Sequence, residues 1–342
     1  MADKEITFKM RKNHVLEVED LHTSFDTEGG RVDAVNGITF AIEKGKTLGI
    51  VGESGSGKSV ASLSILQLLE GTTAHIRQGE IRFMGKNLLA LTRAQMRKIR
   101  GNRIAMVFQE PMTSLNPTMT IGSQIAEPII FHQGKSKSEA WKAAVEMLTL
   151  VGMPEPKKRA KQYPFELSGG MRQRVMIAIA LACGPDVLIA DEPTTALDVT
   201  IQAQILTLIK RLQREMDTSI IMITHDLGVI AETCDFVAVM YCGKIVEYTS
   251  AFSLFTEPKH PYSKGLLESI PSHEEDSEEN LKTIEGAVPS PYELPPGCAF
   301  APRCPYAKEI CHKSMPELTG EPEQHVRCFI YQTDHWKGED LW

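Results

Sequence analysis

Residues 52–59 read GESGSGKS, which places two glycines five positions apart and follows the second with lysine and serine. An apolar run, KTLGIV at 46–51, precedes the loop, and SVASLSILQLLEG follows it with apolar residues at helical spacing up to Gly71. The stretch therefore predicts a buried strand, a glycine loop and a helix, which is the arrangement of a phosphate-binding P-loop.

Each residue type in this loop suits the binding of a nucleotide. Glycine lets the backbone approach a phosphate without a Cβ clash, and successive amide groups at a helix N-terminus attract anions. Lys58 is expected to contact the β- and γ-phosphates of ATP, and the Ser59 hydroxyl to bind Mg²⁺. The other predicted nucleotide contacts in the loop are Gly52, Ser54, Gly55, Ser56, Gly57 and Val60.

A second motif, VLIADE at 187–192, supplies two carboxylates. Its apolar residues predict a buried strand that delivers Asp191 and Glu192 to the end of the sheet where α/β proteins bind ligands. Asp191 suits the binding of Mg²⁺ through water, and Glu192 suits orienting or deprotonating an attacking water. Such a motif is weak evidence alone, but after a P-loop it indicates a site that hydrolyses a nucleotide.

The rest of the pattern predicts an α/β fold. Strands alternate with helical segments such as 199–216, which favours a mainly parallel sheet. A helical insert is expected between 110 and 180. The other predicted buried strands are RIAMVF (103–108), DVLIAD (186–191), SIIMIT (219–224) and FVAVMY (236–241).

The composition of the chain is that of an ordinary globular protein. It has 342 residues, of which 42% are hydrophobic and 24% charged. A net charge of −7 disfavours nonspecific binding to nucleic acid. No apolar run reaches membrane-spanning length, and the N-terminus is polar. We therefore expect a cytosolic protein whose membrane role, if any, comes through a partner.

Further motifs resemble those of the ABC-type ATPases. LSGGMRQR at 167–174 is similar to the signature of that family, Gln109 ends a strand as in the Q-loop, TALD at 195–198 resembles the D-loop, and His225 in ITHD resembles the switch histidine. The motifs follow one another in the order typical of the family. The resemblance implies a P-loop NTPase core at 1–109 and 176–250 with an antiparallel side sheet, and a helical subdomain at 110–175.

The resemblance also implies roles for individual residues. Gln109 is expected to sense Mg²⁺ and water, His225 to bond the γ-phosphate, and Phe25 to stack on adenine. Ser168, Gly169 and Gly170 are expected at a helix N-terminus that completes the nucleotide site of a second subunit. Asp198 is expected to link the two sites across the interface.

Finer features resemble the ATPase subunits of oligopeptide and dipeptide importers. These are QEPMTSLNP at 109–117, HPYSKGLL at 260–267 and a cysteine-containing tail, although Phe165 stands where relatives often carry histidine. The resemblance implies a heterodimer with a related ATPase, two transmembrane permease subunits and an extracytoplasmic binding protein, with this chain peripheral on the cytoplasmic face. Uptake of nickel or oligosaccharides is the alternative. A soluble ABC protein of translation or DNA repair, and a binding module without activity, fit the residues less well.

The C-terminal extension, predicted over 251–342 with an acidic linker at 272–281, carries four of the seven cysteines. Cys298, Cys304, Cys311 and Cys328 can bind Zn²⁺ or a [4Fe–4S] cluster. They lack the close pair usual in structural zinc sites, and the resemblance favours the cluster. His312 and His325 are expected at the surface, although either can replace a cysteine ligand. The remaining cysteines, Cys183, Cys234 and Cys242, are expected to be small buried hydrophobes.

Overall fold

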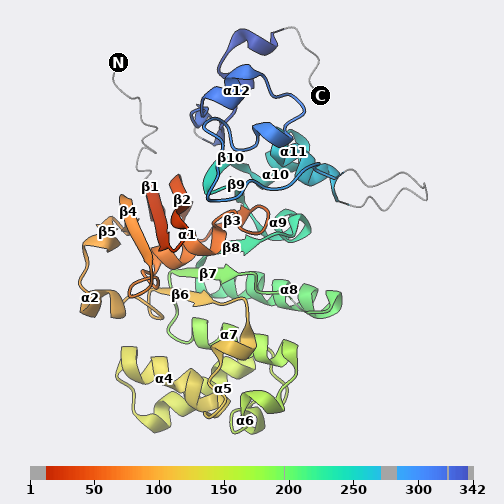
Figure 1. Ribbon diagram of the computed structural model, residues 1–342. Coiled ribbons are helices and arrows are strands. Elements are labelled where there is room, and N and C mark those ends of the chain that lie inside the picture. Colours follow the sequence, from red (N-terminus) through yellow and green to blue (C-terminus); the bar gives the residue numbers. More distant parts are fainter. Residues whose placement is uncertain (1–12, 196, 271–282, 322, 338–342) are drawn as a thin grey trace, which may run out of the picture.

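The computed structural model describes residues 13–195, 197–270, 283–321 and 323–337 (Figure 1). The predicted acidic linker at 272–281 lies outside the described residues. Within these ranges the chain forms two sheets, with a group of helices below the larger sheet in the view of Figure 1 and a C-terminal region above it.

The larger sheet has its strands in the order β11-β12-β10-β9-β3-β8-β7-β6. The strands from β9 to β6 are parallel, and the others continue the sheet antiparallel. Every residue of β3, β7 and β8 is buried, as expected for parallel strands covered on both faces. The parallel strands are those predicted from the apolar runs. The bounds are β3 (Thr47–Val51), β6 (Ile104–Val107), β7 (Val187–Asp191), β8 (Ser219–Thr224), β9 (Phe236–Tyr241), β10 (Lys244–Ser250), β11 (Thr319–Glu321) and β12 (Gln324–Val326).

The topology gathers the predicted motifs at one edge of this sheet. β3 and β7 both pair with β8, so the three strands are neighbours and their carboxyl ends lie side by side. β3 ends immediately before the P-loop, β7 ends at Asp191, and β8 ends at the residue before His225. A candidate site at this edge is therefore a direct consequence of the strand order.

The smaller sheet is antiparallel, which confirms the predicted side sheet. Its order is β2-β1-β4-β5, with β1 (His14–Thr27), β2 (Gly30–Glu43), β4 (Ala74–Phe83) and β5 (Lys86–Asn87). Buried residues such as Leu21, Ile38 and Phe40 pack in one apolar cluster with Ile50 of β3 and Ile65 of α1. The two sheets thus share a core around the helix that follows the P-loop.

The helices of the 110–180 region pack below the larger sheet (Figure 1). α4 (Ile121–Gln133) ends at Gly134, whose φ of +65° favours glycine. α5 (Lys137–Leu150) begins with a capping box in which Ser136 and Glu139 each bond the other's backbone amide. With α6 (Pro156–Arg159) and α7 (Gly169–Leu181) they bury an apolar cluster that continues to β6 and β7.

The helix after the P-loop is shorter than predicted. α1 spans Lys58–Ile65, so the prediction that it continues to Gly71 is wrong. The chain turns at Gln67, which has a φ of +51°. The guanidinium of Arg100 donates hydrogen bonds to the carbonyls of Leu66 and Gln67. A contact from a distant segment therefore satisfies carbonyl groups that another helical turn would otherwise satisfy.

The remaining helices of these layers are short, except for α8 (Val199–Met216), which has the bounds predicted from its apolar period. α9 (Leu227–Thr233) follows β8, and α3 (Pro111–Ser114) adds one turn at the start of the predicted helical insert. The others are α2 (Arg93–Arg97) and 3₁₀ turns at Leu88–Ala90 and Pro164–Glu166. No helix within the described ranges is long and apolar enough to cross a bilayer.

The C-terminal region is joined to the core through the larger sheet. β12 pairs with β10, opposing Val326 to Glu247 and His325 to Tyr248. His325 is only 4% exposed, so the prediction of a surface histidine is wrong at this position. The other elements here are α10 (Ala251–Thr256), α11 (Pro261–Glu268), α12 (Glu309–Lys313) and 3₁₀ turns at Ala301–Arg303, Phe329–Tyr331 and Asp334–Trp336.

Candidate active site

The P-loop connects β3 to α1 and is packed tightly against the core. A Cβ on Gly52 would lie 2.1 Å from the carbonyl oxygen of Met240, and a Cβ on Gly57 would lie 2.3 Å from that of Ala34. Gly57 also has a φ of +100°. Only glycine fits these two positions, and both place the loop between β2 and β9.

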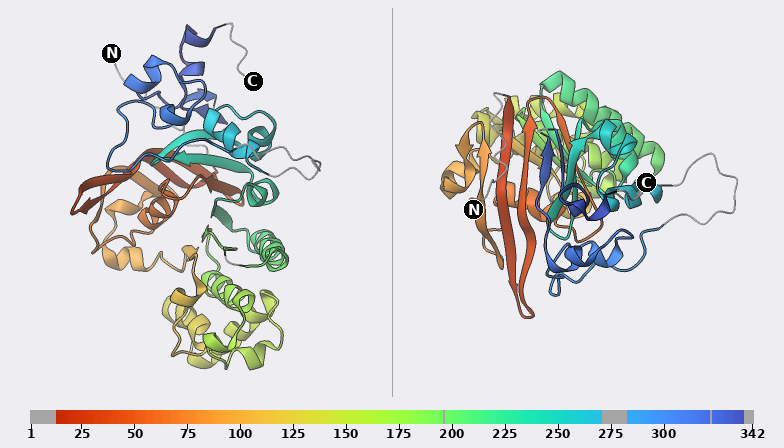
Figure 2. Two further views of the ribbon diagram at one scale, coloured as in Figure 1. Left: turned by 45° about the vertical axis from the view of Figure 1, so that its right-hand side comes forward. Right: turned by 90° about the horizontal axis from the view of Figure 1, so that it is seen from above.

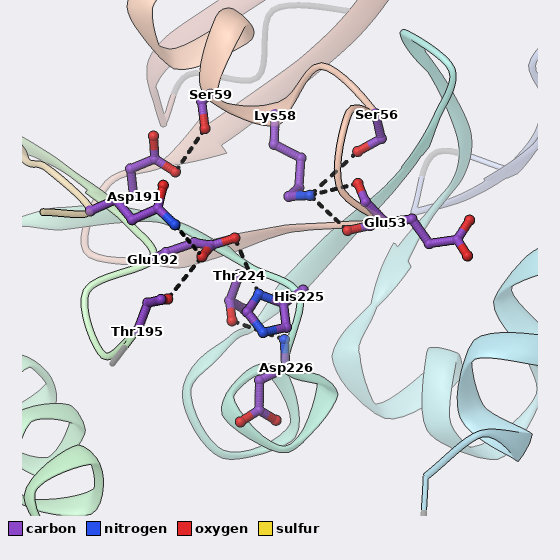
Figure 3. Close-up of polar contacts among 12 residues, drawn as sticks. Glu53, Ser56, Lys58, Ser59, Asp191, Glu192, Thr195, Thr224, His225 and Asp226 are labelled. Carbon is purple, nitrogen blue, oxygen red and sulfur yellow. Dashed lines mark hydrogen bonds and ion pairs between the residues drawn. The ribbon is translucent and has the colours of Figure 1, made fainter. Parts of the chain in front are cut away.

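The ammonium group of Lys58 is held inside the loop (Figure 3). Nζ donates hydrogen bonds to the carbonyls of Gly52 at 2.7 Å and Glu53 at 2.9 Å. Burial lowers the pKa of Lys58, and the nearby charges of Glu192 and Asp191 oppose that shift. The loop thus holds a cation that is ready to meet a phosphate group.

Asp191 and Ser59 form an oxygen-rich corner beside the lysine. The Ser59 hydroxyl lies 3.2 Å from Oδ1 of Asp191, to which it donates (Figure 3). Burial raises the pKa of Asp191, which is only 5% exposed. A buried carboxylate and a hydroxyl are oxygen ligands of the kind that Mg²⁺ prefers, so this pair fits the predicted ion.

Glu192 is the centre of a polar network (Figure 3). Its Oε2 accepts hydrogen bonds from Gln109 at 2.9 Å and from Thr195 at 2.8 Å, and its Oε1 lies 3.1 Å from Nδ1 of His225. Burial acts to raise the pKa of Glu192, but the bonds from Thr195 and His225 outweigh it and the pKa is lowered. The network therefore keeps this carboxylate ionised. The structure brings Gln109, Glu192 and His225 together as predicted, whereas the Thr195 contact was not predicted.

A cavity of about 590 Å³ opens over the P-loop. Gln109 and Glu192 line it, together with the loop from Ser54 to Val60. Val32 lines the cavity too. Phe25, which lies opposite Val32 in the pairing of β1 with β2, is not among the lining residues. The contact of Phe25 with adenine therefore stays a prediction. Cys242, predicted to be a buried hydrophobe, also lines the cavity, with a pKa raised to about 11 by burial.

The signature residues lie at the start of α7 and do not line this cavity. Ser168 is the N-cap of α7, and a Cβ on Gly170 would lie 2.8 Å from Cγ2 of Ile201. Asp198 caps α8 by accepting a hydrogen bond from the amide of Ile201 at 2.9 Å. Ser168, Gly169, Gly170 and Asp198 therefore form one neighbourhood at two helix N-termini, and their contact with a second subunit stays a prediction.

An ion pair ties the C-terminal region to the P-loop. The guanidinium of Arg303 bonds both carboxylate oxygens of Glu53, at 2.7 and 3.1 Å. The Arg303 side chain is 4% exposed and also donates to the Tyr241 hydroxyl at 3.2 Å. A bidentate pair of this kind fixes orientation as well as distance. No motif or spacing in the sequence predicted this contact.

The four cysteines of the tail line one small cavity of about 20 Å³. Burial raises the pKa of Cys298, and it raises those of Cys304 and Cys328 to about 12. All four are free thiols. Within the described ranges, no group of three or more Cys, His, Asp or Glu side chains is placed to hold a metal ion. The structure thus brings the predicted cysteines together and assigns no metal to them.

Comparisons with known proteins identify two family regions. Residues 35–195 match the model of the ABC transporter family, which covers the P-loop, the signature and Glu192. Residues 246–311 match the model described as the oligopeptide/dipeptide transporter C-terminal region, which includes Arg303 and three of the four clustered cysteines.

Individual relatives cover nearly the whole chain. The oligopeptide transport ATP-binding protein AppD of Bacillus subtilis is 52% identical over 94% of this chain and 98% of its own length. The dipeptide transport ATP-binding protein DppD of the same species is 52% identical over 92% of this chain and 94% of its own. Among solved structures, the dimeric cassette MJ0796 with ADP and phosphate has a TM-score of 0.62 at 28% identity, covering 69% of this chain and 98% of that one. The chain is therefore an ABC-type ATPase and belongs to the family of oligopeptide and dipeptide transporter ATP-binding proteins.

Proposed function

We propose that this ATPase powers the import of oligopeptides or dipeptides across a cell membrane. The observation that carries the proposal is the match of residues 246–311 to the peptide-transporter C-terminal region, next to an ATPase site whose motif residues are all present. The names of AppD and DppD describe peptide transport in those proteins and support the same role here. Import of nickel or oligosaccharides is the alternative.

The hydrolytic step follows from the geometry of the site. The backbone amides of the P-loop and the Lys58 ammonium bind the phosphates of ATP. Ser59, Asp191 and Gln109 are the residues that would hold Mg²⁺, which supplies charge neutralisation at the β- and γ-phosphates when bound. Glu192, kept ionised by its network, orients and deprotonates the attacking water. His225 contacts the carboxylate of Glu192, and from this position it can donate a hydrogen bond to the γ-phosphate.

The assembly that we propose places two ATPase subunits head to tail. Ser168, Gly169 and Gly170 of one subunit then face the nucleotide of the other, and Asp198 links the two sites. The partner is a related ATPase, and the pair acts on two transmembrane permease subunits and, through them, on an extracytoplasmic binding protein. The chain lies on the cytoplasmic face of the membrane and has no nucleic-acid partner. We also propose the division into a core at 1–109 and 176–250, a helical subdomain at 110–175 and an extension at 251–342.

Peptide uptake tests this proposal. Cells that lack the chain are expected to lose uptake of labelled dipeptides or oligopeptides, because the permease has no energy source. The wild-type chain restores uptake. The Glu192→Gln variant is made in the cell but hydrolyses almost no ATP, so it fails to restore uptake. Normal peptide uptake without the chain, together with loss of nickel or oligosaccharide uptake, would favour the alternative substrate and leave the ATPase activity unaffected.

We further propose that Cys298, Cys304, Cys311 and Cys328 hold a [4Fe–4S] cluster, with Zn²⁺ as the alternative. The support is the convergence of these thiols on one cavity and a wide ligand spacing without a close cysteine pair. Burial disfavours the thiolate forms of these cysteines, and a bound cation would offset the free-energy cost of deprotonating them.

Metal analysis of anaerobically purified protein checks this site. We expect iron and inorganic sulfide in equal amounts, lost in Cys304→Ser and retained in Cys183→Ser, whose cysteine lies outside the cavity. Chelation is expected to loosen the extension while the ATPase core stays folded, because metal binding stabilises only the structure built around it. Zinc without iron would support the alternative, and the absence of both would remove the site.

A further inference from the structure

The C-terminal extension forms part of the wall of the nucleotide cavity. Besides the P-loop and β2, the lining of the 590 Å³ cavity contains Val288, Pro289, Ser290, Pro291 and Leu294. These residues belong to one segment, Val288–Leu294, which contains a turn closed by a hydrogen bond from the Glu293 amide to the Ser290 carbonyl and lies more than 200 positions after the P-loop in the chain. The cavity is therefore shared between the ATPase core and the extension.

The residues that line the cavity differ in chemistry. Ser54, Lys58, Ser59, Gln109 and Glu192 supply polar and charged side chains, and the P-loop motif assigns the phosphates to this part of the lining. The other lining residues of the core are mostly apolar, and so are four of the five contributed by the extension. A planar base with a ribose is the part of ATP that suits an apolar wall with a few polar groups.

Contacts at the tip of the β1–β2 hairpin hold this segment against the core. The Tyr292 hydroxyl lies 3.2 Å from the Thr27 hydroxyl. A Cβ on Gly29 would lie 3.1 Å from Cε1 of Tyr292, so the tyrosine ring rests on the glycine. Figure 2 shows the blue C-terminal region beside the long red strands of this hairpin in both views.

Arg303 closes the segment into a loop and anchors it on the phosphate site. Its Nε donates to the carbonyl of Glu285 at 3.1 Å, and its Nη2 donates to that of Ile284 at 3.2 Å. The same guanidinium forms the ion pair with Glu53 in the P-loop. One side chain, from a position beyond Leu294, therefore joins Ile284 and Glu285, which precede the segment, to the phosphate-binding loop, and it fixes the wall relative to the phosphates.

We infer that Val288–Leu294 binds the adenine and ribose of the nucleotide, so that the extension supplies a nucleoside subsite of the ATPase. The apolar side chains and proline rings of the segment cover the base, and Arg303 positions them. This inference rests on nucleotide binding at the P-loop and is independent of which substrate the transporter carries.

The test compares two probes that share phosphates but not a nucleoside. In the full-length chain, the double variant Val288→Ala with Leu294→Ala is expected to weaken ATP binding by roughly 10- to 100-fold, which is the usual effect of removing apolar contacts from a binding pocket. Binding of inorganic tripolyphosphate is expected to stay within about twofold, because its contacts lie on the P-loop. Phe252→Ala, on the exposed face of α10 and 78% exposed, is the matched control and should alter neither affinity.

Calorimetric titration of both probes decides between the outcomes. Equal weakening of ATP and tripolyphosphate would overturn the inference, because the segment would then act only by positioning the P-loop, and unchanged affinity for both would overturn it as well. If the double variant does not fold, Val288→Ala alone gives the same comparison, since Val288 is 37% exposed and lies outside the apolar core. Failure of the wild-type chain to bind ATP would instead question the ATPase site itself.

Discussion

Replacing Glu192 with glutamine is expected to leave ATP binding intact and to reduce hydrolysis by about 10²- to 10⁴-fold, the usual contribution of a positioned general base. The amide has the size of the carboxylate and can still meet Gln109, Thr195 and His225, but it cannot take a proton from water. Binding by calorimetry and steady-state phosphate release in the assembled transporter measure the two quantities separately.

Glu110→Gln is the matched control for this variant. Glu110 is an exposed carboxylate next to Gln109, and its side chain makes no capping bond to α3. The Glu110→Gln variant should hydrolyse ATP at the wild-type rate. Wild-type turnover in Glu192→Gln would remove Glu192 from its role, and loss of ATP binding would mean that its network is needed to hold the site together.

Lys58→Ala is expected to raise the dissociation constant for ATP by about 10²- to 10³-fold. Breaking one buried charge contact typically costs about 3–5 kcal/mol, and each 1.4 kcal/mol corresponds to a factor of ten. The lysine is 6% exposed and already lies inside the loop. Its ammonium group can therefore contact a bound phosphate without any rearrangement of distant segments.

Competition with a fluorescent ATP analogue measures this loss. Lys46→Ala serves as the control, because Lys46 is a half-exposed lysine just before β3 that pairs with Asp235 away from the cavity. An ATP affinity within twofold of wild type in Lys58→Ala would show that the backbone amides alone hold the phosphates.

Contiguous patterns predicted most of the fold and much of the site. The parallel strands were predicted because each is a short apolar run, and the P-loop because its glycines, Lys58 and Ser59 occupy fixed positions around one turn. The grouping of Gln109, Glu192 and His225 was implied by the resemblance to the ABC-type ATPases, and it agrees with the rule that ligands bind at the carboxyl ends of parallel strands. The motifs behind these features each consist of a few consecutive residues.

The features that were missed depend on contacts between distant segments. α1 ends where Arg100 bonds the carbonyls of Leu66 and Gln67, and His325 is buried because β12 joins β10. The contact between Arg303 and Glu53 spans 250 positions, and no periodicity or spacing indicates it. A prediction from sequence places residues along elements, whereas these pairs arise only when the elements are packed together.

The pair between Arg303 and Glu53 also has a consequence for synthesis of the chain. Glu53 places a carboxylate within a loop that must attract an anion, and the residue that neutralises it is made 250 positions later. The P-loop is held against β9, which ends at Tyr241, so a core that can bind phosphate is synthesised about 60 positions before Arg303. At about 5–20 residues per second, a ribosome needs roughly 3 to 12 seconds to cover those positions. During this interval the nascent core carries the Glu53 carboxylate beside its phosphate site without the guanidinium of Arg303. ATP should therefore bind well only to chains that are nearly complete, and unfinished chains should not compete for it.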